Sequence, residues 1–405
     1  SGPLSLVVLS SNFSSEQLSF YYTFFSLIAM QQLLEMGIGF TIKQAIAHAY
    51  SAISHTTVKN YNRNIQNYFT FSLLWFVGIA LFIILIGLLG VIFFSDYVGN
   101  IEWYKPWICL IAATSIFILF NPLQLLLEGC QYQIELNKAK IFSSIASITS
   151  LIFSIISGLE LYSIAVSAIF GNLTMYICLY VPLKKLYIEL DGFVNLMLPV
   201  KDVFDDLKNM LAKISFVWIL GYFFWNSFNL IAFKFVDLVT AGKLALTLAI
   251  VRSCFNVSES LVSSQVTLYS NYIAINEEWK SRKIFYKSLT MVVTLFLLAF
   301  ILIFSIKKIA PDFQIFDKVL DDYNVFLIFT YFLVINIINC LANYCRCFKK
   351  EPFFYLSTAM NIIIPLLFFL QVFYWNNISF LLLNITILFF LIWSFRIFNQ
   401  TTVSK

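Results

Sequence analysis

Residues 68–94 read YFTFSLLWFVGIALFIILIGLLGVIFF, a run without a charged side chain. A helix needs about 20 consecutive apolar residues to cross the hydrocarbon core of a bilayer. Inside lipid every backbone N–H and C=O must be satisfied, and a helix does this within one segment. The run therefore predicts a transmembrane helix, and it assigns the chain to the class of all-α integral membrane proteins.

The rest of the sequence has the same character. Of its 405 residues, 60% are hydrophobic and only 12% are charged, whereas an average soluble domain has about 25% charged residues. We predict about 12 transmembrane helices, of which the first, at residues 3–10, is truncated. The other predicted spans cover residues 18–47, 68–94, 106–129, 139–158, 162–182, 210–233, 239–269, 288–306, 323–345, 353–373 and 378–395.

The few charges orient these spans and exclude some functions. Alternate connections carry 19 of the 26 Lys and Arg residues, and positive residues are retained on the cytoplasmic side. We therefore expect a multi-pass protein with a cytoplasmic C-terminus. The cations form no clustered basic face, so nucleic acid is not an expected partner. The cysteines and histidines lack metal-ligand spacing, so no metal site is expected.

The spacing of the spans predicts an internal repeat. Six spans are followed by a long polar stretch and then by six more, an organisation that many transporters share. We predict an N-terminal six-helix bundle over residues 1–183, with its first helix incomplete, and a C-terminal six-helix bundle over residues 209–405. Residues 184–208 mix apolar, Lys and Asp residues, which is typical of an amphipathic linker at the cytoplasmic interface.

Charged side chains inside the spans are the first candidates for a site, because a charge at the bilayer centre costs ~2.5–3.5 kcal/mol. Arg252 lies near the middle of the eighth span, and we expect it to attract an anionic group in a water-filled substrate cavity. Lys43 is a second candidate for this cavity, although its amine could instead extend to the interface. Glu35 and Glu259 are candidate counter-ions or proton sites.

Other residues in the spans could bend a helix or bind sugars. Gly37 and Gly39 allow close helix packing or a bend in the second span, and Pro122 is expected to kink the fourth. A polar stripe follows the boundary between the halves, and its hydroxyls and amides could bind sugars or join neighbouring helices. We count Asn226, Asn229 and Gln265 of this stripe among the cavity candidates.

Three stretches resemble a known family. They are SSEQLSFYYTFFSLIAMQQLLEMGIGFTIKQAIAHAYS (14–51), PLQLLLEGCQYQIELNKAKIFSSI (122–145) and VDLVTAGKLALTLAI (236–250). These stretches are similar to Wzx-type O-antigen flippases of the multidrug/oligosaccharidyl-lipid/polysaccharide (MOP) exporter superfamily. The shared motifs are loose, mainly an acidic residue before Gly-x-Gly in the second span and a Gly after the fourth. The incomplete first span departs from the family.

The resemblance implies two six-helix bundles around a central cavity, in the bacterial inner membrane. Alternating access would carry an undecaprenyl-pyrophosphate-linked oligosaccharide, an O-antigen or capsule repeat unit, across the bilayer. Arg252 matches the cationic cavity residues that serve such substrates. Coupling to an H+ or Na+ gradient would involve Glu35 or Glu259, without an organic cofactor. A polysaccharide polymerase and a chain-length regulator are the implied protein partners.

Two other functions remain open. A multidrug or cation exporter of the same superfamily would favour a cavity rich in carboxylates, and Arg252 argues against it. A membrane polysaccharide polymerase or glycosyltransferase usually carries a large external loop with catalytic residues. Here the longest external connection, residues 307–322, is short, and we read its aspartates as a solvated acidic loop. No residue is therefore predicted to be catalytic, and the protein is not expected to be an enzyme.

Overall fold

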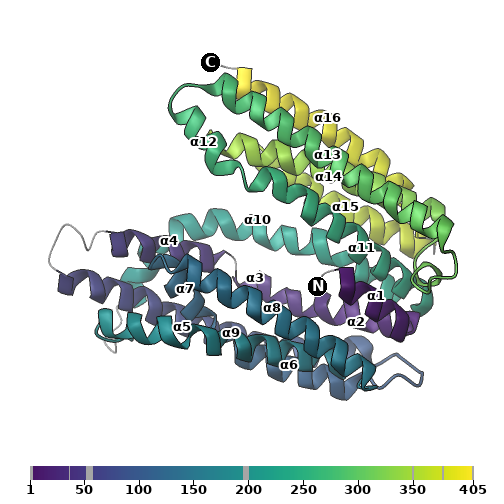
Figure 1. Cartoon of the computed structure of the whole chain (residues 1–405), viewed down its shortest axis with the longest axis horizontal. Helices are drawn as coiled ribbons and strands as arrows, with labels where there is room; N and C mark the ends of the chain where they lie inside the picture. The colour runs from purple at the N-terminus through teal and green to yellow at the C-terminus, as the bar shows by residue number, and fades with distance from the viewer. Residues whose placement is uncertain are drawn as a thin grey trace. The chain divides into compact units, whose positions relative to one another are not determined.

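The computed structural model describes residues 3–35, 37–51, 58–194, 200–348, 351–375 and 378–403. Helices are joined by short connections throughout, and these ranges contain no strand (Figure 1). The helices are α1 (Pro3–Asn12), α2 (Ser15–Ile28), η1 (Ala29–Gln31), α3 (Gln32–Glu35), α4 (Ile38–Ser51), α5 (Val58–Phe94), α6 (Tyr104–Ile118), α7 (Asn121–Gly129), α8 (Gln133–Ile156), α9 (Tyr162–Glu189), α10 (Val200–Phe235), α11 (Leu238–Ser263), α12 (Val266–Ala274), α13 (Glu278–Ile309), η3 (Phe316–Lys318), α14 (Asp322–Arg346), α15 (Phe354–Trp375) and α16 (Leu381–Val403).

The predicted all-α membrane fold is confirmed. Within the described ranges, nine helical segments are long and apolar enough to cross a membrane. Large apolar side chains such as Leu81, Ile92 and Phe389 are exposed along them. A water-soluble protein rarely exposes such an extensive apolar surface, whereas a surface that faces lipid requires it.

The predicted span over residues 18–47 is interrupted rather than formed by a single helix. This stretch forms α2, the 3-10 turn η1, the short α3 and then α4. Gly37 stands between α3 and α4 with φ +71°, a left-handed conformation that glycine adopts without steric cost. The helices of this region begin at Ser15 and end at Ser51, beyond both predicted boundaries, and glycine at this position allows the backbone to leave the helix.

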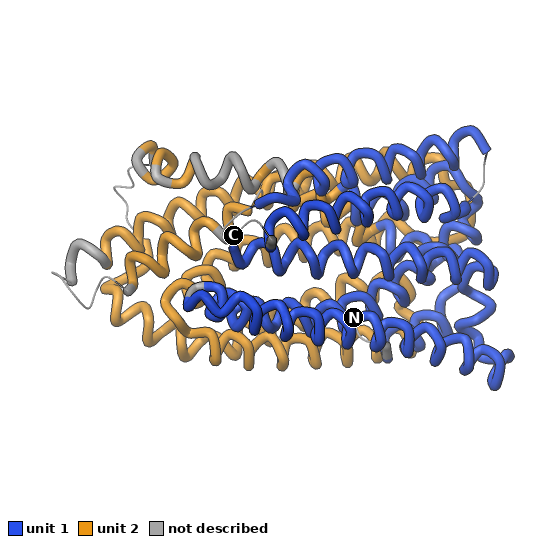
Figure 2. The backbone as a smooth tube through the Cα atoms, turned by 90° about the horizontal axis from the view of Figure 1, so that it is seen from above, with its two compact units in different colours: residues 1–23, 223–405 blue, residues 24–222 orange. Residues whose placement is uncertain are grey.

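Contacts divide the chain into two compact units, coloured separately in Figure 2. Unit 1 comprises residues 1–23 and 223–405, and unit 2 comprises residues 24–222. The predicted bundles of residues 1–183 and 209–405 divide the chain by the number of membrane spans rather than by contacts, and they stay a prediction. Residues 184–189 and 200–208 of the predicted linker continue α9 and begin α10, while residues 195–199 lie outside the described ranges.

Unit 1 is built around α14, which is the most buried of the nine candidate spans and packs against α11, α13 and α16. The start of the chain joins this unit because α1 packs on α11. The Lys318 amine donates hydrogen bonds to the carbonyls of Ser10 (2.6 Å) and Phe13 (2.7 Å), where α1 turns into α2. Burial lowers the pKa of this amine, against a smaller opposing effect of Asp317.

Unit 2 packs α8 along α9, α6 against α5 and α9, and α4 against α5 and α7. Two glycines set the distance between α4 and α7. A Cβ atom on Gly129 would lie 2.5 Å from Ile46 Cγ2, and one on Gly39 would lie 3.4 Å from Leu125 Cδ2. The absence of side chains at these positions lets α4 approach α7 closely.

Candidate functional site

Two predicted membrane spans are interrupted, and one of the two breaks lies in each unit. In unit 1 the predicted eighth span is divided into α11 and α12, and Gln265 lies at the break. In unit 2 the second span is divided at η1, α3 and Gly37. The second and eighth spans occupy corresponding positions in the predicted repeat. Broken helices at corresponding positions of the two halves typically mark the binding region of a transporter.

Arg252 is half-buried on α11, and its partners come from α10. Its Nη2 donates a hydrogen bond to the Trp225 carbonyl, and its guanidinium carbon lies 5.7 Å from the centroid of the Trp225 ring. The Trp225 ring contacts Phe255 and Phe332, at centroid distances of 5.6 and 6.4 Å. The cation is therefore stabilised by an aromatic face and a carbonyl dipole.

No carboxylate in the described ranges neutralises the charge of Arg252. Among the described residues, Arg252 forms no ion pair. Within the described part of the chain, its Nε and the hydroxyl of the buried Tyr331 on α14 both lack a hydrogen-bond partner, and the two residues interact electrostatically. Arginine keeps its proton in proteins. A positive charge with spare donors thus stands inside a membrane span.

Glu259, two turns after Arg252, belongs to a different network. Its Oε1 accepts a hydrogen bond from Asn343 Nδ2 at 2.7 Å. Asn343 Oδ1 in turn accepts one from Arg346 Nη1 at 3.1 Å, and Arg346 Nε lies 3.3 Å from Glu351 Oε2. The structure therefore joins Glu259 to the end of α14 rather than to Arg252.

The polar stripe of the eighth span is partly used for packing. The buried Ser258 accepts a hydrogen bond from Asn336 Nδ2 at 2.7 Å, which links α11 to α14. Ser260 is exposed and donates to the Val257 carbonyl of its own helix. On α10, Asn229 is buried and Asn226 is half-buried. The serines thus act largely as interhelical or intrahelical hydrogen-bonding groups, whereas the roles of the two asparagines stay a prediction.

In unit 2, Glu35 ends α3 beside the break. The built Cβ of Gly39 would lie 3.7 Å from Glu35 Oε1, so the carboxylate lies against the first turn of α4. There the positive end of the helix dipole favours a negative charge. The indole of Trp75 donates a hydrogen bond of 3.0 Å to the Leu34 carbonyl. At this interruption the Leu34 carbonyl thus has a hydrogen-bond donor, and the Glu35 carboxylate lies beside the break.

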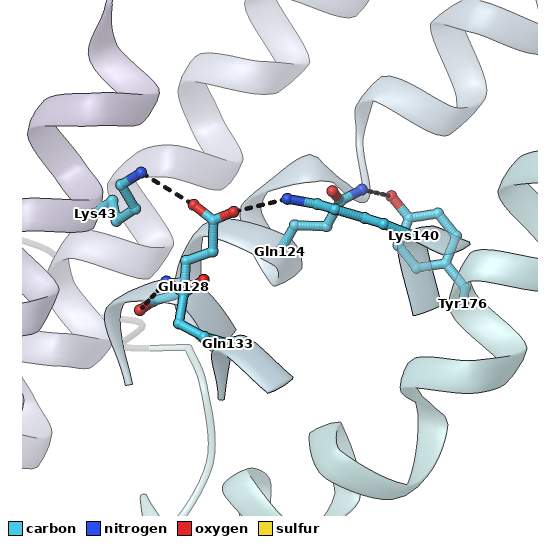
Figure 3. A network of polar contacts seen from close by, with 6 residues as sticks. All are labelled: Lys43, Gln124, Glu128, Gln133, Lys140 and Tyr176. Atoms are coloured by element: carbon cyan, nitrogen blue, oxygen red, sulfur yellow. Dashed lines mark hydrogen bonds and ion pairs between the residues drawn. The ribbon is translucent and has the colours of Figure 1, made fainter. Parts of the chain in front are cut away.

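Lys43 does not stand alone as a cation. Its amine lies 3.1 Å from Glu128 Oε2, while Lys140 lies 2.9 Å from Glu128 Oε1 (Figure 3). Nearby, Gln124 donates a hydrogen bond of 3.0 Å to the Tyr176 hydroxyl (Figure 3). Glu128 on α7 thus bridges α4 and α8, and its side chain is only 17% exposed. The ion pair reduces the charge that Lys43 could offer to a substrate.

We expect Glu128→Gln to destabilise the protein by ~1–3 kcal/mol, because two amines would then face a neutral amide. Thermal unfolding of the purified protein in detergent measures the effect. Lys140→Gln is the control, since it leaves the pair of Lys43 and Glu128 intact and Lys140 is 47% exposed. An equal change in both variants would contradict a bridging role for Glu128.

Pro122 lies at another interruption. Helix α6 ends at Ile118 and α7 begins at Asn121, so Pro122 occupies the first turn of a new helix. At that position proline's missing N–H costs no hydrogen bond. The proline thus accompanies a division of the fourth predicted span into two helices.

An apolar cavity of 330 Å³ lies within unit 1, and Arg252 is not among the residues that line it. Residues of α1, α11, α13 and α14 line it, together with the connection that contains η3. The ion pair of Lys307 and Asp322 stands among its few polar groups. Its walls suit a hydrocarbon chain.

Several residues of this region were missed in the sequence. Trp225 lies 27 residues before Arg252, and nothing in the sequence reveals that α10 packs beside α11 at this level. Asn336 and Asn343 offered a usable pattern, because they are seven residues apart in an apolar span and therefore share a helix face. That pattern resembles the spacing of Arg252 and Glu259.

Comparison with known proteins gives a match at the level of structure. No protein-family model and no curated protein matches the sequence. One similar solved structure is the inward-facing conformation of a multidrug resistance MATE family transporter of the MOP superfamily. It is 14% identical, with a TM-score of 0.72, over 99% of this chain and 95% of that one.

A second similar structure is a MOP superfamily transporter from Pyrococcus furiosus, described as having a binding pocket of reverse polarity. It is 13% identical, with a TM-score of 0.50, over 98% of this chain and 91% of that one. At this level of identity the likeness concerns the fold. This chain is a multi-pass membrane protein that has the fold of MATE-type transporters of the MOP superfamily.

Proposed function

We propose that this protein is a transporter that flips an undecaprenyl-pyrophosphate-linked oligosaccharide across the bacterial inner membrane, with its C-terminus in the cytoplasm. The fold supports transport, and Arg252 supports the class of substrate. A polysaccharide polymerase and a chain-length regulator would be its partners in the membrane. No enzymatic step is part of the proposal.

The observation that carries the proposal is the charge of Arg252. A positively charged guanidinium attracts anions and repels cations. Inside a membrane span the low dielectric constant makes both electrostatic interactions stronger than they are in water. Its planar donors suit pyrophosphate oxygens, and Nε is without a partner in the described part of the chain. A site for cationic drugs would place a carboxylate here, so the multidrug alternative is less well supported.

The rest of the substrate can be assigned to other surfaces. The polyprenyl tail would lie in lipid and in the apolar cavity of unit 1. The amides of Asn226, Asn229 and Gln265 would meet sugar hydroxyls. Lys43 would act at most as a weak auxiliary cation, since Glu128 pairs with it. Glu35 and Glu259 are proposed to couple transport to an H+ or Na+ gradient.

A binding experiment separates the two transport functions. Farnesyl pyrophosphate, a short soluble polyprenyl pyrophosphate, and tetraphenylphosphonium, an apolar cation, are each titrated into the purified protein while tryptophan fluorescence is recorded. We expect farnesyl pyrophosphate to bind more tightly, and Arg252→Gln to weaken its binding ~10- to 100-fold because charge-assisted hydrogen bonds are lost. Tighter binding of the cation would instead favour a drug exporter.

A further inference from the structure

We propose that the first two turns of α13 bind the headgroup of an anionic phospholipid. Trp279, Arg282, Lys283 and Tyr286 recur at a spacing of three and four residues, which places them on one face of the helix. Together with Glu278 they line a surface pocket of 440 Å³. The pocket lies within unit 1 and is separate from Arg252 and from the apolar cavity.

The cations of this pocket retain donors for a ligand. Arg282 uses Nη2 to donate a hydrogen bond to the Thr402 carbonyl in the last turn of α16, which fixes the guanidinium beside the pocket. Lys283 is exposed and forms no ion pair with a described residue. Lys287, one turn further on, is likewise exposed and outside the ion pairs of the described ranges.

Two acidic residues begin the helix and reduce the positive charge only in part. Glu277 pairs with Lys280 at 2.7 Å. Glu278 lines the pocket itself. The first turns of α13 also contain four cations, so positive charges outnumber these two carboxylates: Lys280, Arg282, Lys283 and Lys287. The net positive charge is complementary to the negative charge of a phosphodiester. The N–H donors of the Arg282 guanidinium are suited to hydrogen bonds with the phosphate oxygens.

The aromatic residues place the pocket at the depth of lipid headgroups. Trp279 is 65% exposed and Tyr286 is 47% exposed. Trp and Tyr rings are favoured at the membrane interface, where their polar group contacts water and headgroups while the rest of the ring contacts hydrocarbon. The Lys280 amine lies 5.5 Å from the Trp279 ring centroid. The pocket is therefore where α13 enters the bilayer.

The remainder of α13 can carry the acyl chains of the same lipid. It is the least buried of the nine candidate spans in the described ranges. Exposed apolar residues, among them Met291, Leu295 and Leu298, continue along the helix from the pocket. A molecule with a phosphate group and two hydrocarbon chains thus fits both the charged turns and the apolar helix that follows them. This site is independent of the proposed transport function.

The test uses the full chain and native mass spectrometry. Dioleoyl-phosphatidylglycerol is the probe, and dioleoyl-phosphatidylcholine is the comparison lipid with a neutral headgroup. We expect the Arg282→Gln/Lys283→Gln variant to bind phosphatidylglycerol about tenfold or more weakly, because each cation near an anionic lipid surface strengthens binding roughly fivefold. Lys283→Gln alone should lose part of the affinity, and it leaves the hydrogen bond to Thr402 in place.

The matched control is Lys184→Gln/Lys185→Gln in the last turns of α9, which are exposed and lie on the same predicted side of the membrane. It changes charge equally and should leave phosphatidylglycerol binding unchanged. Equal losses in the two double variants would overturn the site. So would binding of phosphatidylcholine as tight as that of phosphatidylglycerol. Inorganic phosphate that displaces the lipid at low concentration would assign the pocket to a free anion and would also overturn the proposal.

Discussion

Arg252→Ala is expected to abolish export of surface polysaccharide in a strain that depends on this protein, while the amount of protein in the membrane stays unchanged. The substitution removes a cation from the middle of the predicted eighth span, where it has no carboxylate partner among the described residues. Loss of a charge-assisted contact to pyrophosphate costs at least ~10- to 100-fold in binding. Because the same contact must hold the substrate during the crossing, export should fall by a similar factor or more.

Arg252→Lys should retain part of the activity. Lysine keeps the charge, but it lacks the planar fork and stacks less well on the Trp225 ring. Arg396→Ala removes an exposed cation from α16 and serves as the control for a general effect of charge. Polysaccharide is measured on the cell surface, and protein by immunoblot of membranes. Full polysaccharide in the alanine variant would remove Arg252 from the mechanism.

Gly242→Ala is expected to destabilise the protein by about 3 kcal/mol, at the upper end of the range for overpacking. A Cβ atom at Gly242 would lie 1.7 Å from the Ser15 carbonyl oxygen. That atom is backbone, so no side-chain rotation relieves the clash. Either the beginning of α11 or the beginning of α2 must move. The displacement would also strain the hydrogen bonds from Lys318 to Ser10 and Phe13.

Thermal unfolding in detergent measures this effect, and Gly78→Ala is the matched control. Gly78 lies in helix α5, and a Cβ there meets no atom within 4 Å. Alanine at that position should be neutral or slightly stabilising, by up to ~1 kcal/mol. A Gly242→Ala variant as stable as the parent would show that the start of the chain does not pack against α11 as described.

The membrane class and most spans could be predicted because they depend on local composition. The run at residues 68–94 needs no partner to be recognised, since lipid is the partner. Breaks within the spans were predictable only where a glycine or proline marks them. Gly37 and Pro122 both lie at breaks. The break after Ser263 has no glycine or proline, so it must depend on packing that the sequence does not display.

The environment of the candidate site was harder to predict, because it depends on which helices pack together. Arg252 was recognisable from its position, but its partner Trp225 was not. For Lys43 the sequence left both a cavity position and an extension to the interface open, and it could not show that α4 lies close enough to α7 for Lys43 to pair with Glu128. That proximity follows from Gly129, where a side chain would strike Ile46. Gly129, at the end of α7, thus allows the ion pair that reduces the charge of Lys43 on α4.

The central claim is that this fold moves an anionic lipid-linked glycan, and flipping in proteoliposomes tests it most directly. Vesicles contain a polyprenyl-pyrophosphate oligosaccharide with a fluorescent label on the sugar, and an impermeant quencher is added outside. The purified protein should raise the rate at which protected label becomes accessible, and the Arg252→Ala protein should not. An equal rate with and without protein, or with and without Arg252, would contradict the proposed function.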